Sequence, residues 1–138
     1  MANQFQAQIL TPVGKVYDGE VTGVQVPGEA GSFEVKVNHA PIISTLDIGP
    51  VRLTTPQRNN RYFAISGGFL EVNDNKLTLL AESAEEADKI DIDRARSAKE
   101  RALGILADKQ TEPDRERMER ALRRAENRLK VAEKGKKG

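Results

Sequence analysis

Arginine and aspartate side chains are concentrated in one short stretch that reads KIDIDRARSAKER. On a helix, Arg94 and Arg101 are seven residues apart and therefore share one face. Further along the chain, Arg120, Arg124 and Arg128 form a row with four-residue spacing, in which like charges repel. Guanidinium groups bind phosphates and carboxylates through paired, charge-assisted hydrogen bonds. The spacing therefore indicates either a solvated basic face or a binding site for a phosphate or an acidic protein surface.

Two carboxylates, Asp91 and Asp93, lie in the same stretch. Asp91 comes directly before the helical pattern, where its side chain can accept a backbone N–H as an N-cap. The neighbouring arginines keep both carboxylates ionised, which does not suit a general acid. The chain has one histidine and no cysteine, so thiolate chemistry and disulfides are excluded and a zinc site is disfavoured. These features argue against a free-standing enzyme.

The basic residues fall on two predicted amphipathic helices. Apolar residues recur at helical spacing from Asp91 to about Lys109, and again from Met118 to Ala132. A break at 110–113 separates the two, and Pro113 suits the first turn of the second helix. Two such helices with a short link form an antiparallel hairpin. Both apolar stripes are narrow and rich in alanine, so the hairpin buries little area, is held weakly and can move.

The N-terminal part instead alternates apolar and polar residues, as strands do. The runs with this pattern are residues 5–10, 21–26, 32–37, 40–46, 51–55, 61–66, 69–72 and 76–81. Asn73, Asp74 and Asn75 join the last two through a tight turn. The sequence therefore predicts an antiparallel β-sandwich of about ten strands over residues 1–85, followed by an α-helical hairpin over residues 86–138.

The net charge of +1 conceals a division between the two parts. Residues 1–90 hold 7 Lys+Arg against 11 Asp+Glu, and residues 91–138 hold 15 against 10. Glutamates distributed along the second helix would repel nucleic acid phosphates, so we expect no nucleic acid partner. No apolar run is long enough to span a bilayer, and the N-terminus lacks the pattern of a signal peptide, which fits a cytosolic setting.

Four segments together resemble one known family. They are APII at 40–43 after His39, ISGGFLEV at 65–72, KLTLLAESAEEADKID at 76–91 and LRRAENRLKVAE at 122–133. In their order and coverage they resemble the ε subunits of bacterial F-type ATP synthases, of the ATP-binding type found in Bacillus. The resemblance implies a non-catalytic subunit of the central stalk that couples proton-driven rotation to ATP synthesis.

The resemblance also implies partners and a place in the cell. Residues 1–85 would bind the γ subunit and the c-ring, and residues 86–138 would form a regulatory domain that can reach the catalytic β subunits. The chain would be peripheral at the cytoplasmic face of the cell membrane, with membrane contact only through the complex. The family usually has Pro-Gly where this chain has Val37 and Asn38, so the loop before His39 is expected to differ in shape. His39 itself is expected to be structural.

Some members of this family bind ATP through a motif of Ile or Leu, Asp, two variable residues, Arg and Ala. Residues 90–95 of this chain, IDIDRA, fit the motif. By resemblance, the adenine would be surrounded by Glu85, Ile90, Asp91 and Ala95. The phosphates would face Arg94, Arg101, Arg124 and Arg128. ATP would act as a regulatory ligand that is not hydrolysed, and the hairpin without it would extend and inhibit ATP hydrolysis. The alternative is a β-sandwich adaptor with a basic helical arm that binds a protein partner without nucleotide.

Overall fold

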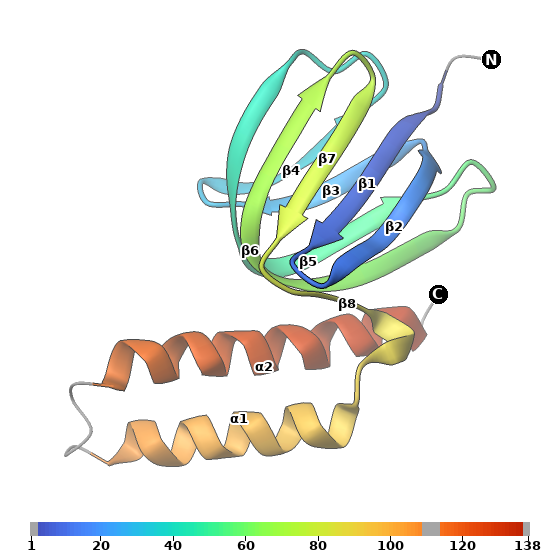
Figure 1. The fold of residues 1–138 in the computed structure, drawn as a ribbon. Helices are drawn as coiled ribbons and strands as arrows, with labels where there is room; N and C mark the ends of the chain where they lie inside the picture. The colour runs from blue at the N-terminus through green and yellow to red at the C-terminus, as the bar shows by residue number, and fades with distance from the viewer. Residues whose placement is uncertain (1–2, 109–113, 137–138) are drawn as a thin grey trace.

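The structure is a computed structural model that describes residues 3–108 and 114–136. Eight strands form one curled sheet in the described residues, and two helices lie beside it (Figure 1). The strands are β1 Phe5–Thr11, β2 Gly14–Val21, β3 Gly23–Gly28, β4 Gly31–Lys36, β5 Ile42–Thr54, β6 Asn60–Asn73, β7 Lys76–Ala81 and β8 Ala84–Glu86. The helical elements are the 3-10 turn η1 Ala87–Lys89, α1 Ile92–Ala107 and α2 Arg115–Lys136.

The sheet curls into a sandwich because its two long strands take part in both layers. The strand order is β2-β1-β7-β6-β5-β3-β4, with β8 paired to β6. One end of β6 pairs with β8 at residues 63–65, and the other pairs with β7 at residues 68–73. All the strand pairs are antiparallel except β1 with β7, which is parallel. The predicted β-sandwich followed by a helical pair is confirmed.

The strand pattern in the sequence identifies most strands but divides them differently. The separate runs at 40–46 and 51–55 are parts of the single strand β5, and the runs at 61–66 and 69–72 are parts of β6. The alternation of apolar and polar residues does not identify β2 and β8. β2 is an edge strand with mostly exposed or half-buried residues and two glycines, so it lacks a clear apolar alternation. β8 has only three residues.

The sandwich has its own apolar core, which contains no residue of either helix. Alternate residues of β1, Phe5, Ala7 and Ile9, point into it as the alternation predicts. The turn between β6 and β7 also agrees with the prediction, because Asp74 and Asn75 both have positive φ angles. That conformation is typical of a two-residue type I′ turn.

The helical hairpin stacks on the sandwich mainly through α2. In Figure 1, α2 lies between the sandwich and α1, so α1 reaches the sandwich mainly through its partner helix. The expected break at 110–113, with Pro113 in the first turn, lies outside the described residues. A small apolar cluster joins α2 to the sandwich; it consists of Ala64, Ile90, Val131 and Ala132, with Tyr62, Ala87 and Ile92 packed against it.

The loop before His39 contains one residue in the left-handed conformation, Asn38. Asn38 has a φ of 62°, a region that glycine favours and that asparagine tolerates better than most residues. Its backbone N–H donates to Asn75 Oδ1 at 2.6 Å, and Asn75 Nδ2 donates to Asn38 Oδ1 at 3.0 Å. Asn38 therefore links this loop to the turn between β6 and β7.

Candidate functional site

The predicted nucleotide residues are divided between the junction of β8 with α1, the body of α1, and α2. Glu85 of β8 and Arg128 of α2 form an ion pair, with Arg128 Nε donating to Glu85 Oε1 at 2.5 Å. Two members of the predicted set, 43 residues apart in the chain, are thus in direct contact. The pair connects the sandwich to the second helix.

The position of Glu85 is fixed by the next residue of β8. Arg61 donates from Nε and Nη2 to the two carboxylate oxygens of Glu86, both at 2.7 Å. This paired geometry, with the opposite charge of Glu86, raises the pKa of Arg61 above its ordinary value. Arg61 also lies over the ring of Tyr17, 5.0 Å from its centroid. Neighbouring strand residues point to opposite faces, so anchoring Glu86 leaves Glu85 on the other face.

The start of α1 carries the motif residues in two different environments. Asp91 is the N-cap, and its Oδ1 accepts the backbone N–H of Arg94 at 3.0 Å, as the sequence analysis expects of a capping aspartate. Ile90 is 8% exposed and belongs to the apolar cluster that contains Val131. Ala95 is buried on the inner side of α1. Local capping and packing therefore already account for three of the motif positions.

The four predicted arginines are not gathered in one cavity. Arg94 and Arg101 are exposed on α1. Arg124 is half-buried on α2 and lines a groove with the sandwich, while Arg128 is paired with Glu85. Within the described part of the chain, the guanidiniums of Arg94, Arg101 and Arg124 make no ion pair or hydrogen bond. They are available to an anion.

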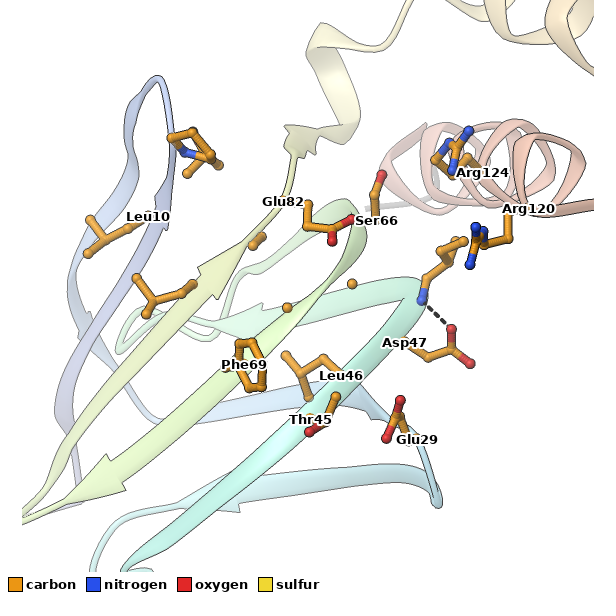
Figure 2. Close-up of a pocket in the computed structure, with 17 residues that line it drawn as sticks. Leu10, Glu29, Thr45, Leu46, Asp47, Ser66, Phe69, Glu82, Arg120 and Arg124 are labelled. Carbon is orange, nitrogen blue, oxygen red and sulfur yellow. Dashed lines mark hydrogen bonds between the residues drawn. The ribbon is translucent and has the colours of Figure 1, made fainter. Parts of the chain in front are cut away.

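The groove beside Arg124 has a volume of about 830 Å³ and lies between α2 and the sandwich. Figure 2 shows Arg120 and Arg124 on the helix side, with Leu10 and Phe69 on the sheet side. Leu80 lies opposite Phe69 on one neighbouring strand and opposite Leu10 on the other, so these three make an apolar row across β6, β7 and β1. Phe69 is 57% exposed and Leu80 51% exposed. An exposed apolar row of this kind is typical of a protein-binding surface.

Two polar contacts between α2 and the sandwich were not anticipated from the sequence. Asn127 is buried, and its Nδ2 donates to the backbone oxygens of Gly49 at 2.8 Å and Ile65 at 3.4 Å. Arg123 Nη2 lies 2.9 Å from Asp47 Oδ2. The polar pattern of α2 suggests a solvated face, and only the position of the sandwich reveals that part of this face is an interface.

The ion pair of Asp47 with Arg123 is expected to make the stability of the docked hairpin depend on pH. Partial burial opposes ionisation of Asp47, but hydrogen bonds from Arg123 and the Ile48 N–H outweigh it and hold the carboxyl pKa below its ordinary value. The pair therefore stabilises the docked hairpin above about pH 4, and this contribution is lost as pH falls through the lowered pKa. Both side chains are nearly half exposed, so we expect less than about 1 kcal/mol.

An NMR titration of the Asp47 carboxyl carbon measures this effect. Arg123→Gln is expected to move the pKa of Asp47 up towards its ordinary value, whereas the exposed Arg117→Gln is expected to leave it unchanged. An equal shift in both variants, or none in Arg123→Gln, would contradict the assigned pair.

The described residues contain no group of three or more His, Cys, Asp or Glu side chains placed to hold a metal ion. Neither described helix combines the length and the apolar character that a bilayer crossing requires. The arrangement offers anion recognition by arginines and contact surfaces for other proteins.

Comparisons with known proteins agree with this architecture. Residues 4–87 match the family model described as ATP synthase, delta/epsilon chain, beta-sandwich domain, and residues 88–133 match the long alpha-helix domain of the same chain. The chain is similar to the ATP synthase epsilon chain of Bacillus cytotoxicus, with 47% identity over 128 residues that cover 93% of this chain and 96% of the relative. The epsilon chain of Desulforamulus reducens is 40% identical over 135 residues, which cover 96% of this chain and all of the relative.

A solved structure shares the fold at much lower identity. A chain in the cryo-EM structure of the Euglena gracilis mitochondrial ATP synthase, OSCP/F1/c-ring in rotational state 1, superposes with a TM-score of 0.79 at 19% identity. The superposition covers 99% of this chain and 82% of that chain.

Proposed function

The chain belongs to the ATP synthase delta/epsilon family, whose epsilon chains are non-catalytic subunits of the central stalk, and we propose that ATP sets the position of its helical hairpin. With ATP bound, the hairpin stays docked on the sandwich. Without ATP, the hairpin is released, extends along the γ subunit towards the catalytic β subunits and inhibits ATP hydrolysis. Proton-driven rotation is coupled to ATP synthesis through the sandwich.

The observation that supports this proposal best is the limited contact between hairpin and sandwich. Among the described residues, four buried ones form the apolar cluster at this interface, and two of them are alanines. The remaining described contacts include the Asn127 hydrogen bonds and the ion pairs of Arg123 and Arg128. Small apolar area and partly exposed ion pairs contribute little free energy. A ligand of moderate affinity can therefore shift the population between docked and released hairpins.

ATP would bind the docked hairpin more tightly than the released hairpin, because the proposed site is divided between three elements. Glu85 belongs to β8, Arg94 and Arg101 to α1, and Arg124 and Arg128 to α2. Arg128 already lies against Glu85, and the unpaired arginines are available for phosphates. A triphosphate that contacts both helices would bind the docked arrangement and lose contacts when the hairpin extends. Binding to ATP also relieves the repulsion within the arginine row on α2.

The sandwich provides the proposed stalk contacts. The exposed apolar row of Leu10, Phe69 and Leu80 is the surface we assign to the γ subunit, since its burial stabilises a protein contact. The sandwich would also contact the c-ring. With these contacts, the subunit would lie at the cytoplasmic face of the cell membrane and be bound to the membrane only through the complex.

An ATP titration of the full chain tests the proposal. The chain has no cysteine, so dyes can be attached through Gln57→Cys on the sandwich and Lys130→Cys on α2. ATP is expected to narrow the distance distribution between the dyes. Arg94→Ala combined with Arg124→Ala is expected to weaken ATP binding at least about tenfold and to abolish the change in distance, because each charged hydrogen bond contributes about 1.5–3 kcal/mol.

The matched control is Arg96→Ala combined with Arg117→Ala, which removes the same charge from exposed positions on the same two helices. This control is expected to respond to ATP like the unmodified chain. If neither affinity nor hairpin position changes in the Arg94 and Arg124 variant, ATP sensing is ruled out. A chain that binds the γ subunit but never ATP would instead be the adaptor considered as the alternative.

A further inference from the structure

A second cavity lies between the sandwich and the C-terminal end of α2. Its volume is about 240 Å³. The lining residues are Gln25, Pro27, Ser32, Pro50, Arg52, Tyr62 and Lys134. None of them belongs to the residues proposed to bind ATP. The cavity is smaller than the usual range of about 300–1,000 Å³ for drug-sized ligands, which suits a small ion better than a nucleotide.

The floor of this cavity is one row of cross-strand neighbours. Arg52 of β5 lies opposite Gln25 of β3 on one side and opposite Tyr62 of β6 on the other. Their side chains therefore project from the same face of the sheet. This is the face on which α2 docks, since Tyr62 also packs against the apolar cluster of the hairpin. Lys134 of α2 lies above the row, with Nζ 6.0 Å from the centroid of the Tyr62 ring.

The charge of the lining is entirely positive. Arg52 and Lys134 contribute two cations, and none of the lining residues that the structure describes is a carboxylate. Glu34 pairs with Arg52 Nη2 at 2.8 Å but lies outside the lining. Arg52 Nε is buried and has no hydrogen-bond partner in the described structure. A buried N–H without an acceptor costs about 1–3 kcal/mol, so an acceptor that reaches this donor would stabilise the structure.

Neutral donors complete the set. Ser32 Oγ accepts a hydrogen bond from Gln25 Nε2 at 3.1 Å, so the Ser32 hydroxyl proton remains free to donate to a ligand. Tyr62, which also lines the cavity, carries a hydroxyl that can act as a further donor. Arginine, lysine and hydroxyl donors drawn from four different elements form the chemistry that recognises a tetrahedral oxyanion.

We propose that this cavity binds a phosphate group and that the bound anion holds the C-terminal end of α2 on the sandwich. Because Lys134 belongs to α2 and the other donors belong to the sandwich, the site is complete only when the hairpin is docked. Phosphate would therefore favour the docked hairpin by mass action. The proposal does not depend on the ATP site, with which it shares no residue.

The test is a titration of the full chain with inorganic phosphate, at constant ionic strength maintained with chloride. The NMR signal of the Arg52 Nε–H group is the readout, because it reports the orphaned donor directly. We expect a saturating shift in the unmodified chain. Lys134→Gln and Arg52→Gln are expected to weaken phosphate binding at least about tenfold, measured for both by phosphorus NMR line broadening.

The matched control is Lys130→Gln, which removes one positive charge from an exposed position one turn earlier on α2. It is expected to bind phosphate like the unmodified chain. No saturating shift beyond that produced by chloride would overturn the proposal, and so would equal weakening in the two lysine variants. If Arg52→Gln fails to fold, the comparison of the two lysine variants still decides, because both remove a side chain of an exposed helical residue.

A final arm identifies the source of the phosphate group. In the Arg94→Ala and Arg124→Ala variant, ATP is added in place of inorganic phosphate. A shift of the Arg52 signal shows that a nucleotide phosphate occupies the cavity, and a shift with inorganic phosphate alone shows that the free anion does. Both results support the site. Loss of every ATP response in this variant, with an intact response to inorganic phosphate, supports the free anion as the ligand of this cavity and agrees with ATP binding at the separate arginine site.

Discussion

Changing Gly68 to alanine is expected to lower the free energy of unfolding of the sandwich by about 3–5 kcal/mol. Gly68 has a φ of +152° and pairs with Ala81 of β7. A Cβ on Gly68 would lie 2.0 Å from the backbone oxygen of Leu80 and 2.9 Å from the Cα of Ala81. Both of these atoms belong to the backbone, so no side-chain rotation can relieve the steric clashes. The variant must distort the β6–β7 ladder or adopt a strained conformation.

A urea unfolding experiment followed by circular dichroism measures this loss. Gly14→Ala is the matched control, because Gly14 has a φ of +138° but a Cβ there would meet nothing within 4 Å. We expect this control to lose only the conformational term, about 1–3 kcal/mol. Equal losses in the two variants would show that backbone conformation alone determines the effect and that the collision with Leu80 is absent.

The position of Gly68 explains why the consequence extends to function. It lies in β6 next to Phe69, whose exposed side chain belongs to the apolar row that we assign to the γ subunit. A displaced β6–β7 ladder would separate Phe69 from Leu80 and break this row. We therefore expect Gly68→Ala to weaken the stalk contact as well as the fold.

Local sequence patterns were sufficient to predict the elements that local forces determine. The alternation of Phe5, Ala7 and Ile9 reports a strand with one buried face, and Asp74 with Asn75 reports a tight turn. The merging of neighbouring runs into β5 and β6 could not be predicted in this way. Continuity through residues 47–50 and 67–68 depends on pairing with other strands, which is a long-range effect.

In the candidate site, too, features that depend on neighbouring residues could be predicted, whereas long-range contacts could not. Capping by Asp91 follows from residue type and position alone. The contact of Glu85 with Arg128 joins residues far apart in the chain. Local sequence patterns do not predict it, and only the resemblance to a family assigned both residues to one site. Docking of α2 through a polar face was not predictable from apolar periodicity, because that method detects only the stripe of alanine and leucine. α2 contacts both α1 and the sandwich, and its contact with the sandwich uses Asn127 and Arg123.

Asn127 supports the second large prediction. Asn127→Asp preserves the shape of the side chain but replaces an N–H donor by an oxygen that faces the backbone oxygens of Gly49 and Ile65. An ionised carboxylate in this buried place is expected to cost about 3 kcal/mol or more, which exceeds what the small apolar cluster can offset. The hairpin is therefore expected to be released at pH 7, whereas the sandwich remains folded because its core contains no helical residue.

Acidification is expected to reverse this release. A protonated carboxyl can donate to a backbone oxygen as the amide does, so docking raises the pKa of the introduced aspartate above its value in the released hairpin. A raised pKa means that docking is stable at low pH and is lost as pH increases through that pKa. Amide hydrogen exchange along α2, measured at pH 4 and pH 7, would follow the change. The exposed Glu126→Gln is the control and should keep α2 protected at both values. Full protection of α2 at pH 7 in Asn127→Asp would show that this amide does not hold the hairpin on the sandwich.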